Sequence, residues 1–233
     1  ISSIKAAIAA GCDAIECDPR RTADGQIVVC HDENIRRTTT GSGNISDLTL
    51  DQIKSYALKD RNGNPTNESM PTLKEFLEAA RGKVYVDLDY SPRTASPEEV
   101  YRVVKECGMT EQVFFYNNSD IKNKEVLELD PALHAYCWGT PNIYNSLLNK
   151  GRRFFVQYIY NSDVNTINAA RGAGFLLSAC MMDATIGEGV AESHLLQGND
   201  TEMRAMINIG MRMLMTDIPE TMIGYLRANG YHK

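Results

Sequence analysis

Carboxylates gather at the ends of two apolar runs in this chain. Glu16 and Asp18 stand one residue apart at the end of the first run, and Asp87 and Asp89 end another in the same way. Because alternate residues on a strand point to the same face, each pair is expected to project together. A third apolar run ends at His31. Three or four carboxylates beside one imidazole suit a hard divalent cation with an acid/base group next to it, whereas unpaired charge suits a buried core badly.

The elements that must position these residues follow one recurring pattern: an amphipathic helix, a glycine or short turn, and an apolar strand that ends in polar residues. Ser96 and Thr72, each with Glu three residues later, predict helix starts, and glycine after the last turn predicts helix ends. The expected helices are 6–11, 73–82, 98–108, 143–151, 164–174 and 202–210, and the expected strands are 14–18, 84–89, 113–116, 134–138, 154–160, 175–181 and 213–217.

Strands that alternate with helices of about ten residues indicate crossover connections and a parallel sheet. Seven expected strands, with one more expected ahead of the opening helix, predict an α/β fold of the (β/α)8 TIM-barrel type that lacks its first strand in the given sequence. Active groups of such barrels lie at the carboxyl ends of the strands, where the carboxylates fall. A doubly wound open sheet is the alternative; it usually has a Gly-rich phosphate loop after the first strand, and the given sequence shows none.

The regular rhythm breaks once, between residues 18 and 84. Asp24-Gly25 predicts a hairpin turn, a short helix is expected from Thr49, and the polar stretch 61–70 is expected to be a surface loop. We therefore expect a single barrel domain over residues 1–233, with an insertion at approximately 20–70. A long insertion at the catalytic end of a barrel usually shapes the substrate pocket.

The composition is that of an ordinary globular protein, with 43% hydrophobic and 23% charged residues. A net charge of -6 argues against a nucleic-acid binder, which needs a basic face for its phosphate contacts. The sequence has no apolar run of the roughly 18 residues that a membrane-spanning helix requires. Six cysteines without a CxxC spacing fit buried core positions better than a zinc site or a disulfide framework.

The spacing of the chemical groups resembles one family closely. The family pattern places E-x-D, T-x-D-G, H-D and R-T-T in this order, followed by a P-T-L-x-E segment and a late T-D-x-P. The matching segments are 11–18, 22–32, 37–39 with Gly43, 70–75 and 215–219. They resemble the glycerophosphodiester phosphodiesterases over nearly the whole chain. This resemblance implies the barrel fold and the metal-dependent hydrolysis of glycerophosphodiesters to glycerol 3-phosphate and an alcohol, a reaction of lipid and glycerol metabolism that uses Ca²⁺ or Mg²⁺.

The resemblance also implies roles for individual residues. Glu16 and Asp18 are expected to be metal ligands, with Asp87 in the place of the family's third acidic ligand. His31 is expected to be one of two general acid/base histidines, because an imidazole can donate or accept a proton near neutral pH. The candidates for substrate contacts are Asp89, Arg37 and Trp138; packing is an equal alternative for Trp138.

Three departures from the family pattern shape the expectation. The family's first strand carries His-Arg-Gly, which the given sequence does not contain, so we expect this polypeptide alone to be inactive or impaired and the intact protein to be active. Asp89 replaces a phosphate-facing lysine and inverts its charge. The Trp-Thr pattern usual near the seventh strand is replaced by the residues 177–183.

Alternatives to hydrolysis stay open at this point. A non-catalytic or weakened barrel would bind a phosphorylated or sugar ligand, and Asp89 is its main support. A lyase-type phosphodiesterase would give a cyclic phosphate. The Glu16 and Asp18 pair would, in the plainest interpretation, form salt bridges with Arg20 or Arg21. The sequence fixes neither the headgroup of a small-molecule substrate nor the oligomeric state, and the compartment is open: cytoplasmic, or periplasmic or secreted if a missing N-terminal segment held a signal.

Overall fold

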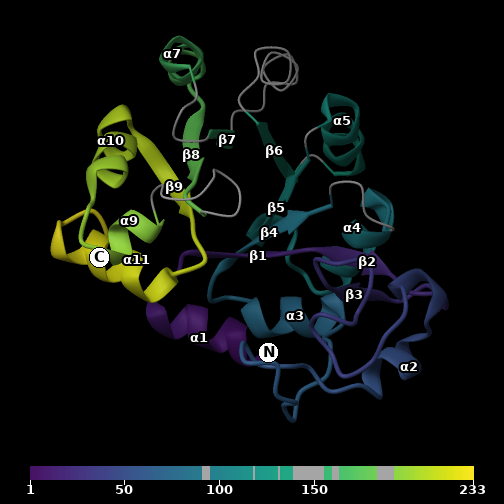
Figure 1. The fold of residues 1–233 in the computed structure, drawn as a ribbon. Helices are drawn as coiled ribbons and strands as arrows, with labels where there is room; N and C mark the ends of the chain where they lie inside the picture. Colours follow the sequence, from purple (N-terminus) through teal and green to yellow (C-terminus); the bar gives the residue numbers. More distant parts are fainter. Residues whose placement is uncertain (91–94, 118, 131, 139–154, 159–162, 183–191) are drawn as a thin grey trace. The chain divides into compact units, whose positions relative to one another are not determined.

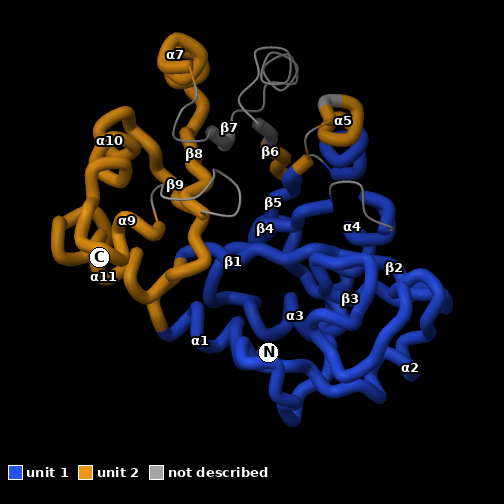
Figure 2. Tube along the Cα trace, viewed as in Figure 1, with its two compact units in different colours: residues 1–9, 13–116, 125–133 blue, residues 10–12, 117–124, 134–233 orange. Residues whose placement is uncertain are grey.

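A computed structural model describes residues 1–90, 95–117, 119–130, 132–138, 155–158, 163–182 and 192–233 of the chain. The chain divides into two compact units (Figure 2). Unit 1 comprises residues 1–9, 13–116 and 125–133, and unit 2 comprises residues 10–12, 117–124 and 134–233. All four carboxylates and the histidine introduced above belong to unit 1.

Unit 1 is built on three parallel strands in the order β1-β4-β5 (Figure 1). A helix precedes each of them, so the sequence alternates helix and strand as the apolar pattern predicts. The strands are β1 (Ala14–Cys17), β4 (Tyr85–Asp89) and β5 (Val113–Tyr116), and the helices are α1 (Ser2–Ala10), α3 (Leu73–Ala80), α4 (Pro97–Glu106) and the short η2 (Thr110–Gln112). These elements confirm the predicted helices and strands of this part of the chain to within a few residues.

The helices of unit 1 begin where their capping residues predict. Thr72 caps α3 and Ser96 caps α4; in both cases the cap side chain accepts from the backbone N–H of the glutamate three residues on, and that glutamate accepts from the backbone N–H of the cap. Pro97 occupies the first position of α4, where its fixed φ suits a helix and its missing N–H costs nothing. These local signals fix where each of the two helices starts.

The predicted hairpin is present and opens the insertion. β2 (Pro19–Arg21) pairs antiparallel with β3 (Ile27–Val29), and Gly25 between them has a φ of +78°, a conformation that glycine adopts without strain. Asp24 of this turn accepts from the backbone N–H of Leu50, which begins α2 (Leu50–Lys54). The turn therefore ties the tip of the hairpin to the helix expected from Thr49.

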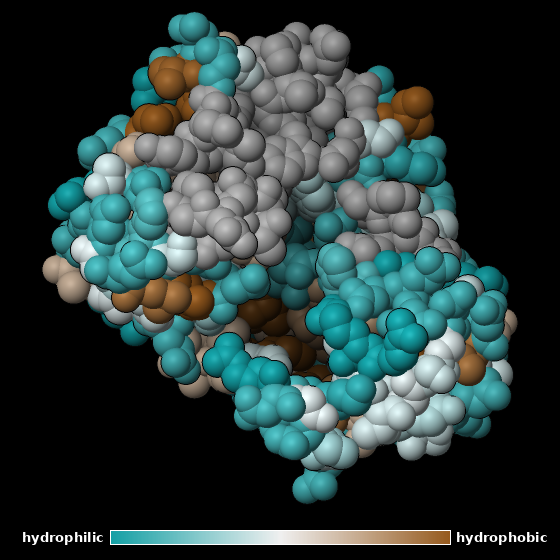
Figure 3. Space-filling model, viewed as in Figure 1, coloured by the Kyte–Doolittle hydropathy of each residue, from teal (hydrophilic) through white to brown (hydrophobic). Residues whose placement is uncertain are grey.

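The insertion packs around a hydrophobic cluster of its own. Its fully buried members come from the hairpin, from the loop that follows, from η1 (Ile45–Asp47), from α2 and from the segment before α3. They are Val28, Cys30, Ile35, Ile45, Ile53 and Met70. On the face shown in Figure 3, the area occupied by the hairpin and α2 is mostly hydrophilic or neutral. The insertion is thus a small packed substructure with a polar surface on this side.

Unit 2 contains four parallel strands in the order β6-β7-β8-β9. The strands are β6 (His134–Trp138), β7 (Phe155–Tyr158), β8 (Leu176–Cys180) and β9 (Met211–Met215), and the helices are α7 (Val164–Gly172), α9 (Glu192–Leu196), α10 (Thr201–Ile209) and α11 (Pro219–Ala228). The strands and the helices α7 and α10 confirm the prediction, whereas the expected helix 143–151 lies outside the described residues. The sequence pattern did not predict α9, α11 or α5 (Asp120–Leu129), which contributes residues to both units.

Burial agrees with the interpretation of the cysteines as core residues. Cys17, Cys30, Cys107 and Cys180 are buried free thiols, and Cys12 is partly buried. Among the described residues, no helix combines the length and apolar character needed to cross a membrane.

Candidate metal centre and active site

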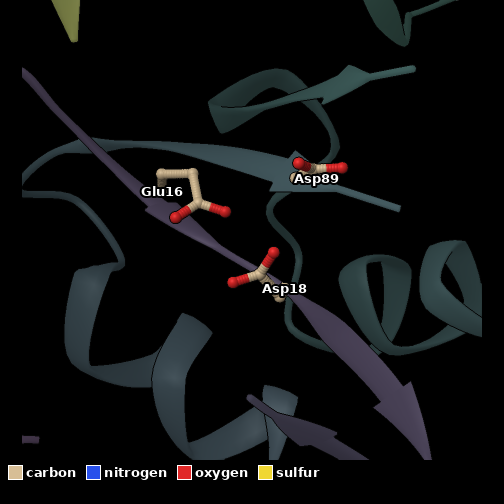
Figure 4. Close-up of side chains that lie close together, drawn as sticks. All are labelled: Glu16, Asp18 and Asp89. Carbon is tan, nitrogen blue, oxygen red and sulfur yellow. The ribbon is translucent and has the colours of Figure 1, made fainter. Parts of the chain in front are cut away.

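Three carboxylates meet at the carboxyl ends of β1 and β4. Glu16, Asp18 and Asp89 each offer an oxygen, and these oxygens all lie within 4.8 Å of one another (Figure 4). Asp18 is buried, Asp89 is partly buried and Glu16 is exposed, so the group is supported from one side and accessible from the other. Ca²⁺–O distances of about 2.3–2.6 Å place opposite ligands up to roughly 5 Å apart. The donors present therefore fit a single hard cation.

Strand register explains why these side chains converge. In the parallel pairing of β1 with β4, Glu16 stands opposite Asp87 and Cys17 opposite Leu88. Side chains at paired positions share a face, and alternate positions repeat it, so all four carboxylates belong to one face. Asp87 is 3% exposed, whereas Asp89 is more accessible. The family resemblance implies that Asp87 is the third ligand and that Asp89 is a candidate substrate contact. Within the described part of the chain, Asp89 is the residue grouped with Glu16 and Asp18.

The pKa of the buried Cys17 thiol responds to the negative charge of the nearby carboxylates. Burial raises the pKa of Cys17 well above its usual value, and the nearby carboxylates Glu16, Asp18, Asp87 and Asp89 raise it further. The thiol therefore stays protonated and is a poor candidate for a metal ligand. The same repulsion that disfavours a thiolate favours a divalent cation among the carboxylates.

His31 lies in the loop after β3 and is held by charged neighbours. Its Nδ1 is 2.9 Å from Oδ1 of Asp32. Arg37 donates from Nε to Oδ2 of Asp32 at 2.6 Å and from Nη2 to Oδ1 at 3.0 Å. These hydrogen bonds, first from Arg37 and then from His31, hold the pKa of Asp32 well below its usual value. An ionised Asp32 favours the tautomer with the proton on Nδ1, which leaves Nε2 as the nitrogen that accepts or returns a proton.

The other sequence candidates are placed less directly. The guanidinium of Arg37, a candidate substrate contact, is engaged with Asp32. Trp138 ends β6, but its side chain lies outside the described residues. Arg21, considered as a salt-bridge partner for the carboxylates, pairs with Glu99 at 2.8 Å. Sequence reasoning did not predict that Asp32 orients His31 and pairs with Arg37. Its position next to His31 and five residues before Arg37 could have indicated this role.

Comparison with known proteins places these residues in a family. Residues 1–137, more than half the chain, match the model of the glycerophosphoryl diester phosphodiesterase family. The chain belongs to this family. A glycerophosphodiester phosphodiesterase from Caldanaerobacter subterraneus subsp. tengcongensis is 26% identical over 239 residues, covering 99% of this chain and 92% of that protein. The matched region contains the E-x-D, H-D and D-x-D segments that form the candidate site.

Solved structures agree on the fold. The crystal structure of a glycerophosphoryl diester phosphodiesterase from Parabacteroides distasonis superposes with a TM-score of 0.83 at 21% identity, covering 98% of this chain and 80% of that chain. A phosphodiesterase from Oleispira antarctica, solved with the product sn-glycerol-3-phosphate, superposes with a TM-score of 0.76 at 17% identity, covering 97% of this chain and 90% of that chain. The fold of this family member is therefore the TIM barrel predicted from its alternating helices and strands.

Proposed function

We propose that the protein hydrolyses small glycerophosphodiesters to glycerol 3-phosphate and an alcohol, with a divalent cation bound at the ends of β1 and β4. The observation that carries the proposal is the group of carboxylate oxygens within 4.8 Å of one another in a family of phosphodiesterases. The Oleispira enzyme, which holds glycerol 3-phosphate as its product, supports the assignment of that product here.

Glu16 and Asp18 are proposed as metal ligands, with Asp87 as the third, as the family resemblance implies. Asp89 adds an oxygen close to the first two, so the site offers up to four carboxylates to one ion. Both Ca²⁺ and Mg²⁺ take oxygen ligands of this kind. When bound, the cation supplies positive charge to the phosphodiester oxygens and to the charge that develops during the reaction.

His31 is proposed as a general acid/base residue. Asp32 accepts from its Nδ1, so Nε2 is the nitrogen that takes a proton from the attacking oxygen or returns one to the departing alkoxide. Asp32 is ionised at neutral pH, and the hydrogen bonds from Arg37 hold its pKa well below the usual value, so it stays ionised in mildly acidic solution as well. The imidazole therefore keeps its orientation and its charge partner while its proton changes.

The insertion is proposed to shape the substrate pocket of one catalytic domain spanning residues 1–233. It contributes His31, Asp32 and Arg37 beside its own buried cluster. Arg37 and Trp138 remain proposed substrate contacts. Because Nε and Nη2 of Arg37 donate to Asp32, its contact with substrate would have to come from Nη1 or from a second hydrogen of Nη2.

The test is a hydrolysis assay of the intact protein with glycerophosphocholine and other headgroups, in Ca²⁺ or Mg²⁺. We expect glycerol 3-phosphate to appear, and we expect chelation to stop its formation. Phosphorus NMR of the product separates hydrolysis from cleavage to a cyclic phosphate. Ligand binding without turnover for every headgroup would contradict the proposal and favour a non-catalytic barrel.

A further inference from the structure

Arg20 is buried beside the candidate site and directed at the backbone that carries His31. It lies on β2 with 8% of its surface exposed. Its Nε donates to the carbonyl oxygens of Cys30 at 3.0 Å and His31 at 3.2 Å, and its Nη2 donates to that of His31 at 2.5 Å. A buried charge is costly unless it is hydrogen-bonded, and these contacts offset part of the cost of burying the guanidinium.

The same carbonyls belong to a segment that is bonded to a proposed metal ligand. Cys30 donates its backbone N–H to the carbonyl oxygen of Asp18 at 3.0 Å. Asp18 is joined to Arg20 through Pro19 alone, and the ring of Pro19 fixes one of the few torsions between them. Asp18 is thus connected to Cys30 in two ways. The first is the backbone hydrogen bond between them, and the second runs along the chain to Arg20 and through its side-chain hydrogen bond to the Cys30 carbonyl.

We propose that Arg20 is a positioning residue that fixes the acid/base histidine relative to the metal-binding strand. The inference rests on the proposed function of His31 and Asp18. The guanidinium is planar and presents its donors in a rigid fork, so it fixes two successive carbonyls with less freedom than a lysine would leave them. A displacement of about 1 Å in a catalytic group can cost on the order of 100-fold in rate, which gives such a clamp a measurable effect.

Two sets of contacts then fix His31 in different ways. Asp32, held by Arg37, contacts the imidazole and sets its rotation and tautomer. Arg20 instead binds the main-chain carbonyl of His31 and so fixes the position of the backbone that carries the ring. Removal of either set is expected to leave Glu16, Asp87 and Asp89 in place, since strand pairing holds them, and Asp18 directly follows the paired strand β1. The effect of Arg20 should therefore appear in turnover and not in cation affinity.

The test compares Arg20→Met with Arg21→Met in the intact protein. The two arginines are neighbours on β2, and each substitution removes one positive charge from the same strand, but Arg21 forms a partly exposed pair with Glu99. For Arg20→Met we expect kcat to fall by about 10- to 100-fold with KM and Ca²⁺ or Mg²⁺ affinity changed by less than about threefold, and for Arg21→Met no comparable loss. Arg20→Lys should recover part of kcat, because one ammonium can still reach a carbonyl.

A second measurement does not depend on activity. Hydrogen exchange of the Cys30 amide reports on its bond to Asp18; we expect exchange to be about tenfold or more faster in Arg20→Met and unchanged in Arg21→Met. If no substrate is hydrolysed, this measurement still decides whether the clamp exists. Equal kcat in the two methionine variants, or equal exchange of Cys30, would overturn the proposal. If Arg20→Met does not fold, the same comparison is made with Arg20→Lys and Arg21→Lys.

Discussion

The carboxylate edge of β1 and β4 and the histidine loop after β3 are positioned in different ways. Glu16 and Asp89 take their places from the pairing of parallel strands, which sets the face and level of every side chain. His31 and Asp32 take theirs from hydrogen bonds donated by two nearby arginines, Arg20 and Arg37. The first region brings several carboxylates to one edge of the sheet, whereas in the second region the carboxylate of Asp32 is paired with Arg37. The two should therefore fail under different perturbations.

The largest effect is expected from Asp18→Asn, which removes a buried carboxylate from the edge. Cation affinity and turnover should both fall by at least about 100-fold, because the remaining amide is a weaker ligand and one negative charge is lost. Calorimetry with Ca²⁺ or Mg²⁺ and the hydrolysis assay measure the two losses. Asp51→Asn, an equal charge change at an exposed position of α2, is the control and should alter neither.

Asp89→Lys tests whether Asp89, which replaces the lysine of the family pattern, contributes to cation binding at the ends of β1 and β4. If Asp89 strengthens the cation site, its replacement by the family lysine should lower cation affinity by about tenfold or more, since an oxygen donor is replaced by a positive charge. Calorimetry measures the change, and Asp89→Asn separates the loss of charge from the introduced cation. Unaltered affinity in both variants would mean that Asp87 alone completes the site.

Arg37→Met perturbs the histidine loop and should act on stability through pH. The pKa of Asp32 is lowered in the folded protein, so the pair stabilises the fold above the unfolded pKa of about 3.9, and this contribution disappears as pH falls toward the lowered value. For a partly exposed pair we expect Arg37→Met to lose about 0.5–1 kcal/mol of unfolding free energy at pH 7, and this loss should shrink as pH falls from about 3.9 through the lowered pKa.

Denaturant unfolding at several pH values checks this sign. Arg37→Lys, which keeps the charge but not the two-pronged geometry, should lie between the two proteins. If the difference in unfolding free energy between the two proteins grew toward low pH, Asp32 would not be the residue whose pKa Arg37 lowers.

The smallest effect is expected from Tyr90→Phe, directly after the carboxylate edge. The Tyr90 hydroxyl is buried without a hydrogen-bond partner among the described residues, and its ring packs edge-to-face on Phe115 with centroids 5.6 Å apart. Removing the hydroxyl keeps this packing, so unfolding free energy should be unchanged or higher by up to about 1 kcal/mol. Denaturant unfolding measures it, and a loss of stability would reveal a partner for the hydroxyl.

Much of the fold was predictable because its signals are local. Continuous apolar runs such as 113–116 indicate strands covered on both faces, and Thr72 and Ser96 mark helix starts through hydrogen bonds to residues three positions away. The helices α5 and α11 were not predicted because their local signals are weak or were interpreted differently. The apolar residues of α5 define only a weak face, and Pro219 was interpreted as part of a family motif and not as the first residue of a helix.

The candidate site was predictable in its members more than in its arrangement. Alternation along β1 and β4 puts all four carboxylates on one face, but which two strand levels meet depends on a register that the sequence does not state. The same limit applies to Arg20. Its partners are main-chain carbonyls ten and eleven residues away across a hairpin, and carbonyl groups leave no mark in a sequence pattern.

The Asp24 turn has a consequence for how this enzyme family can diversify. Ala23 and Asp24 bind the backbone at Leu48 and Leu50, so the ends of the intervening stretch are tied together at one point. Exchanging exposed residues such as Ser42 and Ser46 would alter a loop whose two ends stay anchored, while the buried Ile45 keeps its packing. If the insertion borders the substrate pocket, as proposed, changes there would alter headgroup preference while the pairing of β1 with β4 keeps the carboxylates in place.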